Sequence, residues 1–417
     1  MPKKNRVVLQ PEYLSRFSCI GGACEDSCCS GWRVSVDKKT FLEYRRVKDK
    51  ALAPLLDEFV KRERKEGVKS DEAYAKINMV KGRCPLQDAQ NLCLIQTTLG
   101  YGALCDVCAV YPRLYKIIDK KLERCATVSC PEAARLVLNN PDGIGFETVE
   151  EGKGVGRIPD RAPSLAPGDA KYAAKPAKFF WEIRMVGLTL LQNREYTVGQ
   201  RLILLGLLCR KIDELDESGR VEEIPNMLET FGASVDDGSL RPDLDAVEGS
   251  FGIQLRLAKE LTDERLKMEL IASKVYLVCM VETLAGIEFV ADTPEATIMK
   301  KYVENRDKYV LPYLKDKEYV LENFVVNEFF ARLMPISINK TAWDSYLYLC
   351  VLFGMVKLHL NGMGGFHKGL TDEIVVRIVQ AFSKMVLHNG KFIPGMIEKL
   401  KANGFDTLGW MTILVSD

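Results

Sequence analysis

Apolar residues in the second half of the chain recur at every third or fourth position, which is the spacing of a helix with one buried face. From residue 177 onward this pattern predicts one helix after another. Thr197, Thr341 and Thr371 precede three of these segments and are suited to cap them. The predicted helices are Phe179–Asn193, Thr197–Leu215, Leu255–Ala291, Glu295–Lys308, Asp316–Met334, Trp343–His359 and Thr371–His388.

The first part of the chain has a weaker helical pattern. Thr40–Lys65 carries helically spaced Leu, Phe and Val residues, with Thr40 as the candidate N-cap and Pro54 as a candidate break. A stretch rich in Gly, Pro, Asp and Lys follows later, which is typical of a linker or a long active-site loop. We therefore expect a mainly α fold in three parts: a cysteine-rich metal-binding module of loops and short helices at 1–138, the linker or loop at 139–176, and an α-helical domain at 177–417.

Two glycine-rich stretches invite comparison with nucleotide-binding loops. They are Gly152–Gly156 and Asn361–Gly369. Neither follows a predicted strand, which a Rossmann-type fingerprint requires. Both are expected to form turns or mobile loops.

Composition places the chain among globular proteins, because 47% of its 417 residues are hydrophobic and 28% are charged. The 58 Lys+Arg and 57 Asp+Glu residues give a net charge of +1, which offers no overall reason to expect a nucleic-acid partner. Residues 1–135 hold 25 basic and 17 acidic residues, hence +8, and the remainder carries −7.

A cytoplasmic location is expected. Runs without a charged residue, such as Ser345–Val356, are shorter than the ~20 residues of a membrane-spanning helix. Residues 1–13 include basic side chains but no apolar stretch of the ~7–15 residues that a secretory signal needs. Neither a membrane nor a nucleic acid is therefore expected as a partner.

The cysteines fall into two populations. Of 13 in total, Cys209, Cys279 and Cys350 stand alone in apolar, helix-like surroundings and are expected to be small buried hydrophobic residues. The other ten lie within one third of the chain: Cys19, Cys24, Cys28, Cys29, Cys84, Cys93, Cys105, Cys108, Cys125 and Cys130. In a reducing compartment such grouped thiols usually bind metal, whereas a disulfide framework suits secreted chains.

The three histidines, His359, His367 and His388, are far from these cysteines in the sequence, so the metal site is expected to be all-thiolate. Thiolates suit both an iron–sulfur cluster and zinc. One short zinc-type spacing occurs, at Cys105 and Cys108, and no ferredoxin run is reproduced. The residues alone therefore allow either an iron–sulfur cluster or zinc. Gly21, Gly22 and Gly31 are expected to allow positive φ or close backbone approach beside the first cysteines.

Four segments of the chain resemble the flagellin lysine-N-methylase family: Phe17–Tyr44, Cys84–Arg113, Ser129–Leu136 and Leu321–Phe330. The cysteine segments are also similar to small zinc- or iron-chelating proteins with a CxxxCC-type signature. By position, the resemblance implies eight metal ligands: Cys19, Cys24, Cys28, Cys29, Cys84, Cys93, Cys108 and Cys130. Cys105 and Cys125 depart from the family's pattern and are doubtful ligands.

The resemblance implies a methyltransferase that moves a methyl group from S-adenosylmethionine to lysine side chains of flagellin, with an iron–sulfur cluster, expected to be 4Fe-4S, and zinc as the alternative. Tyr111 and Arg113 are candidates for binding cofactor or substrate, Tyr111 by lining a lysine channel and Arg113 by anchoring a carboxylate. Ordinary packing and a salt bridge are the competing interpretations. Trp32 and Asp37 are expected to brace the first cysteine segment. The sequence identifies no general base.

A different class of function fits the same residues. The thiolates could serve a non-catalytic zinc- or iron-binding protein, in which the metal only stabilises a helical adaptor or is carried as cargo. A third possibility is another cluster enzyme with the same cysteine module.

Overall fold

The computed structural model describes residues 6–31, 33–63, 70–152, 158, 162–247, 273–290, 293–336 and 341–416, together with residues 250, 252, 255, 256 and 260. Trp32, most of the Gly152–Gly156 stretch and much of the first half of the predicted helix Leu255–Ala291 lie outside the described residues.

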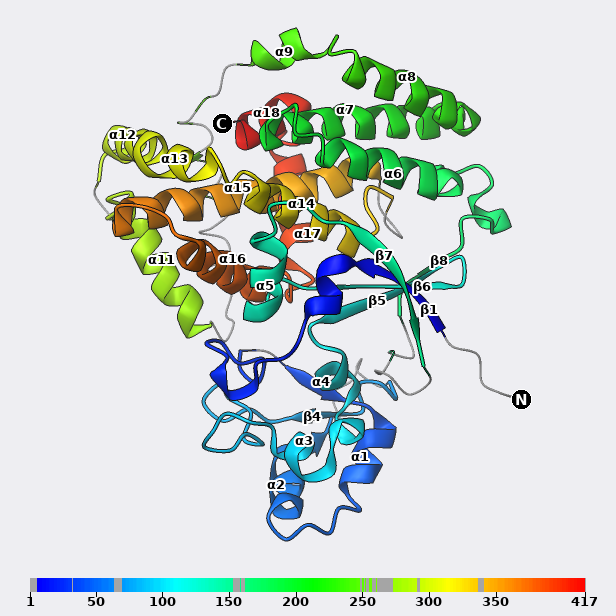
Figure 1. Cartoon of the computed structure of the whole chain (residues 1–417), viewed down its shortest axis with the longest axis vertical. Helices are drawn as coiled ribbons and strands as arrows, with labels where there is room; N and C mark the ends of the chain where they lie inside the picture. Colours follow the sequence, from blue (N-terminus) through cyan, green and yellow to red (C-terminus); the bar gives the residue numbers. More distant parts are fainter. Residues whose placement is uncertain are drawn as a thin grey trace.

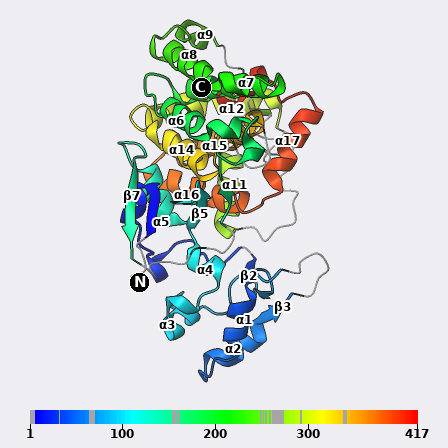
Figure 2. The ribbon, with the colours of Figure 1, turned by 90° about the vertical axis from the view of Figure 1, so that its right-hand side faces the viewer.

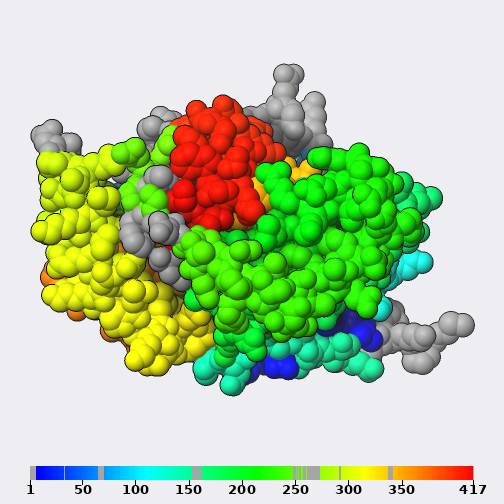
Figure 3. Space-filling view, turned by 90° about the horizontal axis from the view of Figure 1, so that it is seen from above, coloured from blue at the N-terminus to red at the C-terminus, as the bar shows by residue number. Residues whose placement is uncertain are grey.

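The described chain is arranged in three tiers (Figure 1). A body of helices forms the top, a five-stranded sheet lies beneath it, and a small lobe of short helices and strands hangs below the sheet. The side view shows the same order, with α1, α2 and β3 at the end furthest from α8 and α9 (Figure 2). Seen from the helical end, the C-terminal segment lies between the groups of helices coloured green and yellow (Figure 3).

The helical body confirms the mainly α prediction. Its helices are α6 (Phe180–Leu191), α7 (Val198–Glu217), α8 (Ile224–Asp236), α9 (Arg241–Asp245), α11 (Lys274–Gly286), α12 (Glu295–Asn305), α13 (Leu311–Leu314), α14 (Tyr319–Ala331), α15 (Ala342–His367), α16 (Asp372–Val386), α17 (Phe392–Ala402) and α18 (Leu408–Val415). Thr197, Thr341 and Thr371 cap their helices as predicted, each accepting a hydrogen bond from a backbone N–H three residues on.

The five-stranded sheet was not predicted. Its strands are β1 (Arg6–Pro11), β5 (Arg113–Ile118), β6 (Lys121–Ala126), β7 (Phe146–Glu151) and β8 (Ser164–Leu165), in the order β7-β1-β6-β5-β8. β1 pairs parallel with β6 and antiparallel with β7. The stretch 139–176 thus supplies two strands to the sheet, and the three-part division of the chain stays a prediction.

The small lobe, residues 33–63 and 70–110, contains β2 (Val34–Val36), α1 (Lys38–Tyr44), α2 (Leu52–Phe59), β3 (Val60–Arg62), β4 (Ala75–Ile77), α3 (Leu94–Leu99) and α4 (Asp106–Val110). Thr40–Lys65 was predicted to be helical with a possible break at Pro54, but its described part contains the end of α1, the whole of α2 and the strand β3, and the break lies at 45–51. The N-cap is Asp37, whose carboxylate accepts from the Thr40 N–H at 2.8 Å. Pro54 lies in the first turn of α2, where a missing N–H costs no hydrogen bond.

Helix α14 joins the sheet to the helical body and is buried along almost its whole length. The Asn327 side chain accepts from the Tyr13 hydroxyl at 2.6 Å and donates to the Ala126 carbonyl at 3.1 Å. Asn323 donates to the Asn140 carbonyl at 2.8 Å. These partners lie on or beside the sheet tier, so the polar residues of the family-like segment Leu321–Phe330 bind the two tiers together.

Helix α15 runs eight residues beyond its predicted end at His359 and includes most of the glycine-rich stretch Asn361–Gly369. The prediction of a loop there is wrong. A Cβ on Gly362 would lie 2.3 Å from the Thr283 carbonyl oxygen of α11, so glycine lets the two helices approach closely. α15 is also the one described helix long and apolar enough to cross a membrane, but 89% of its apolar window is buried inside the fold.

Replacing Gly362 tests this contact. Gly362→Ala should lower the free energy of unfolding by about 3 kcal/mol, because the methyl group forces α11 and α15 apart. Gly395→Ala is the matched control, since Gly395 lies in α17 with nothing within 4 Å of its added Cβ and should gain ~0.5–1 kcal/mol. Urea unfolding measures both. Equal effects of the two substitutions would contradict the close approach.

His359 lies on α15 inside the core and makes the folded protein sensitive to acid. Its Nδ1 is 2.6 Å from the Met355 carbonyl, its Nε2 is 3.2 Å from the Tyr276 hydroxyl, and burial lowers its pKa to about 4. The unfolded chain binds this proton near pH 6.5, so the stability that His359 contributes is complete above that pH and is lost as the pH falls toward 4.

Unfolding free energies of the wild type and His359→Gln, measured from pH 7 to pH 4, should therefore converge. The wild type should lose roughly 3 kcal/mol more than the variant over this range. Parallel curves would show that His359 does not titrate with folding.

Candidate active site

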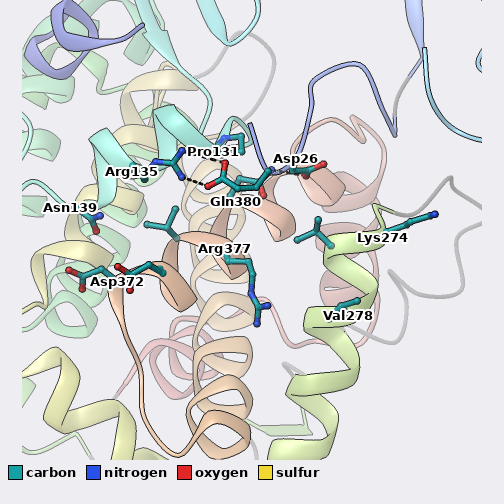
Figure 4. Close-up of a pocket in the computed structure, with 13 residues that line it drawn as sticks. Asp26, Pro131, Arg135, Asn139, Lys274, Val278, Asp372, Arg377 and Gln380 are labelled. Carbon is teal, nitrogen blue, oxygen red and sulfur yellow. Dashed lines mark hydrogen bonds and ion pairs between the residues drawn. The ribbon is translucent and has the colours of Figure 1, made fainter. Parts of the chain in front are cut away.

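A cavity of about 470 Å³ lies where the first cysteine segment meets the helical body. Its walls come from residues 25 and 26, from α5 (Pro131–Leu138), from the N-terminal part of α11 and from one face of α16. Figure 4 shows these four segments around it, with Arg135 on α5, Lys274 and Val278 on α11, and Arg377 on α16. Segments far apart in the sequence therefore build one pocket of the size that small ligands occupy.

A buried ion pair holds residues 25 and 26, which form one wall of the pocket, in place. The Lys384 ammonium on α16 is 2.7 Å from Asp26 Oδ1, and both side chains are at least nine-tenths buried. The Gln380 side chain donates to Asp26 Oδ2 at 3.0 Å and to the Ser129 carbonyl at 2.8 Å. Lys384 also donates to the Ser27 carbonyl at 3.0 Å. These contacts hold residues 19–31, here called the cysteine loop, against α16 and the start of α5.

The pocket combines an apolar wall with a charged rim. Val275, Val278 and Val376 form apolar surface. At the rim, the Arg135 guanidinium is 2.6 Å from a Glu25 carboxylate oxygen. Further rim residues are Lys274, Asp372, Glu373 and Arg377. Such a site suits a ligand with a flat apolar part and groups of both charges.

Four predicted ligands gather beside this pocket: Cys19, Cys24, Cys28 and Cys130. Cys24 and Cys130 immediately precede the lining residues Glu25 and Pro131. Burial raises the pKa of the Cys130 thiol to about 11, and the thiols of Cys24 and Cys19 add to the increase. These four are named the pocket thiol group.

A second set of thiols lies in and against the small lobe: Cys29, Cys84, Cys93, Cys105 and Cys108. Burial raises the pKa of Cys84 to about 12, with contributions from Cys29, Cys93 and Cys105. A hydrogen bond from Cys108 lowers the pKa of Cys105. These five are named the lobe thiol group. A side-chain hydrogen bond between the adjacent Cys28 and Cys29 joins the two groups.

The eight ligands implied by the family resemblance thus divide four and four. Their chemistry suits an all-thiolate metal site in each place. Within the described residues, however, no group of three or more His, Cys, Asp or Glu side chains stands at metal-binding geometry. The ligand set stays a prediction that the gathering of thiols supports.

The remaining cysteines lie elsewhere. Cys125 is buried in β6 against Phe330 and Ala331, and the nearby Lys116 ammonium offsets part of the burial that raises its thiol pKa to about 11. Cys209, Cys279 and Cys350 are buried in the helical core, as expected of small hydrophobic residues.

Tyr111 is close to Cys28 and Cys130 of the pocket thiol group. Neither Tyr111 nor Arg113 is among the described residues that line the cavity. The Tyr111 hydroxyl is 3.2 Å from Ser129 Oγ, and burial raises its pKa, with a further contribution from Cys130. The Arg113 guanidinium stacks 5.1 Å from the centre of the Phe17 ring. Their roles in binding a cofactor or substrate stay predictions.

Gly21 and Gly31 adopt φ of +57° and +82°, and a Cβ on Gly22 would lie 2.5 Å from the Gln90 carbonyl oxygen. The expected need for glycine beside the cysteines is thereby confirmed. The pocket-forming residues Asp26, Gln380 and Lys384 were missed. The sequence offered little signal, because Glu373, Arg377, Gln380 and Lys384 recur at helical spacing and together resemble the solvent-facing side of the predicted helix Thr371–His388.

Comparison with known proteins assigns this chain to a family. The model of the FliB lysine N-methylase C-terminal domain matches residues 184–414, more than half of the chain. The chain belongs to the FliB lysine N-methylase family. The matched region includes α11 and α16, which form two walls of the pocket, and the segment Leu321–Phe330.

Curated relatives agree with this family. A protein named Lysine-N-methylase from Salmonella typhimurium is 32% identical over 143 residues, which are 34% of this chain and 35% of that protein. The flagellar biosynthetic protein FliU of Salmonella muenchen is 32% identical over 143 residues, which are 34% of this chain and 83% of that protein. The match thus spans about a third of the lysine N-methylase's length. No solved structure matches the chain.

The Asp26–Lys384 pair can be tested by breaking it. Lys384→Met should lower the free energy of unfolding by about 3–5 kcal/mol, because it leaves the Asp26 carboxylate buried without its cation. Lys175→Met is the control, since Lys175 pairs with Asp216 at 3.1 Å on the surface and should cost less than ~1 kcal/mol. Denaturant titration compares them. A loss at Lys384 no larger than at Lys175 would contradict a buried clamp.

Proposed function

We propose that this protein is an S-adenosylmethionine-dependent N-methyltransferase that acts in the cytoplasm on lysine side chains of flagellin. The observation that carries the proposal is the pocket at the junction of the cysteine loop, α5, α11 and α16, since the FliB family match includes two of its walls. The names of the curated relatives, Lysine-N-methylase and flagellar biosynthetic protein FliU, support the reaction and the flagellar substrate.

The shape and charge of the pocket suit the methyl donor. S-adenosylmethionine has a flat adenine, a sulfonium cation and an amino acid end. The valines of α11 and α16 offer an apolar surface for the adenine. The donor's carboxylate can pair with Arg135 by replacing its present partner Glu25. The carboxylate of Glu373, and that of Glu25 once it is replaced, favour the positive charge of the sulfonium.

The same rim suits a lysine substrate. A lysine ammonium has a pKa near 10.4, so producing the neutral amine at pH 7 costs on the order of 4 kcal/mol. Carboxylates at the rim attract the ammonium, while the apolar wall disfavours the charged form once water is excluded. One proton leaves the ammonium for solvent. The neutral nitrogen then attacks the methyl carbon as the bond between that carbon and sulfur breaks, which yields protonated methyl-lysine and neutral S-adenosylhomocysteine.

The pocket thiol group is proposed to hold the iron–sulfur cluster, through Cys19, Cys24, Cys28 and Cys130. When bound, such a cluster supplies a redox centre beside the donor. The chain's own contribution is to hold the cysteine loop, with Glu25 and Asp26, in place against α16.

The reaction can be tested with protein purified without air, reduced, and incubated with flagellin and isotopically labelled S-adenosylmethionine. Mass spectrometry should show labelled methyl groups on flagellin lysines. Val278→Trp should reduce donor binding by about tenfold or more, because the indole fills the pocket. Val281→Trp is the control on the same helix, since Val281 is 68% exposed and is not among the lining residues.

A well-folded protein with its iron intact that transfers no methyl group to flagellin would refute the proposal and favour a metal-binding adaptor. Equal donor binding by the Val278 and Val281 variants would refute the placement of the donor in this pocket, even if methyl transfer occurs.

A further inference from the structure

A second, smaller cavity of about 210 Å³ lies on the helical body. Its walls come from the residues that follow α14, the first two turns of α15, the connection between α16 and α17, and the start of α17. Figure 1 shows α14, α15 and α17 near the middle of that body. None of the described residues that line this cavity lines the larger pocket. It is here called the Arg332 cavity, after the cation in its wall.

Arg332 and Tyr348 bring hydrogen-bond donors to this cavity. The Arg332 side chain bonds through Nε to a Glu328 carboxylate oxygen at 3.3 Å. Its guanidinium carbon lies 5.3 Å from the centre of the Tyr348 ring. Burial raises the pKa of the Tyr348 hydroxyl to about 12, so this group stays protonated near neutral pH. Among the described residues, neither the terminal nitrogens of Arg332 nor the Tyr348 hydroxyl has a hydrogen-bond partner, so these donors are available to a ligand.

The charges behind Arg332 do not balance. Arg184 pairs with Glu123 at 2.8 Å, and Arg332 pairs with Glu328. A third cation, Lys116, is 8% exposed, and its ammonium donates to a backbone carbonyl at 3.1 Å. Burial and the two nearby arginines lower the pKa of Lys116 to about 8, which leaves it mostly charged at pH 7. In the part of the chain that the structure describes, three cations therefore share two carboxylates, and a buried charge without a counter-ion is costly.

The rest of the cavity wall is mainly apolar. Leu387, Ile393 and Pro394 contribute to it. Asp344 is the acidic residue among the described lining residues, and the Lys401 ammonium, 2.5 Å from its carboxylate, neutralises it. The cavity thus combines a forked cation, a hydroxyl donor and apolar surface. These are the groups that together recognise an organic carboxylate.

We propose that the Arg332 cavity binds a small organic carboxylate, whose two oxygens accept hydrogen bonds from the terminal nitrogens of Arg332 and from the Tyr348 hydroxyl, while its apolar part packs against Leu387 and Ile393. The planar guanidinium matches both oxygens of a carboxylate at once. The negative charge of the ligand balances the third cation of the buried group. Inorganic anions share this charge but make no apolar contact, so they bind more weakly. The inference does not depend on methyl transfer.

The full-length wild-type protein provides the first test. Titration with butyrate and with benzoate, followed by ligand-detected NMR, should give dissociation constants on the order of 0.1–1 mM. Butyramide, which is neutral, and sulfate, which has no apolar part, should bind at least about tenfold more weakly. Equal binding of butyramide would contradict the need for a negative charge. Equal or tighter binding of sulfate would show an inorganic anion site only. Either result overturns the proposal.

Two conservative variants place the probe in the cavity. Arg332→Lys keeps a cation beside Glu328 but loses the fork, so it should weaken butyrate binding by about tenfold or more. Tyr348→Phe keeps the ring and removes only the hydroxyl, which should weaken binding about fivefold. Arg210→Lys is the matched control, because Arg210 stacks 3.6 Å from the Trp343 ring centre and is not among the described lining residues. It should leave binding unchanged.

The larger pocket is separated from this cavity by Val278→Trp, which fills that pocket and should leave butyrate binding unchanged. Loss of butyrate binding in Val278→Trp would place the probe in the larger pocket and overturn the inference. Full affinity in Tyr348→Phe and Arg332→Lys would overturn it as well. If Arg332→Lys fails to fold, Tyr348→Phe still decides, because it leaves every ion pair intact. Failure of methyl transfer by a protein that binds butyrate in this way would refute the proposed function and leave this inference intact.

Discussion

The buried ion pair between Asp26 and Lys384 is the contact on which the site depends. It fixes the cysteine loop on α16, and Gln380 extends the contact to the Ser129 carbonyl at the start of α5. A buried ion pair is often no more stabilising than apolar packing, because both charges lose their hydration. Its geometry is more selective than apolar packing. An apolar contact could slide by a turn of α16, whereas a carboxylate with two specific donors cannot.

The family-like segment Leu321–Phe330 has a structural role that differs from the role of the pocket residues. Its charged and amide side chains point into the fold, where Glu322 pairs with Arg201 at 2.7 Å and Asn327 binds both Tyr13 and the Ala126 carbonyl. Each of these polar groups would be costly to bury without its partner. The segment is therefore explained by the attachment of the sheet to the helical body. Chemistry at the pocket is supplied by other elements.

The predicted helices could be recognised because each has an apolar period of about 3.6 residues, and three of them follow a threonine cap. Helices α8, α9, α13, α17 and α18 were not predicted. The strands could not be recognised, since β1 pairs with β6 and β7, more than 100 residues away, and short strands have no distinctive pattern. The glycines of α15 were predicted to form a loop. They are needed because α11 packs closely against them, and the local sequence does not show a contact with a distant helix. The two cysteine populations could be recognised from the high density of cysteines in the first third of the sequence. The pocket was missed because its walls come from four separate segments.

The cysteine loop is held at two ends, and the two attachments differ in strength. On the helical side it has the buried Asp26–Lys384 pair. On the lobe side it has backbone hydrogen bonds from Cys84 to Cys29 and from Gly31 to Gly82. A hydrogen bond between neutral groups contributes about 1 kcal/mol, whereas a hydrogen bond to a charged group contributes about 1.5–3 kcal/mol. Loosening of the lobe should therefore free residues 29–31 first and leave Asp26 in place. The order of the lobe then governs Cys29 more than Glu25 and Asp26. The end of the loop that carries Cys29 therefore depends on the lobe, while the pocket wall depends on α16.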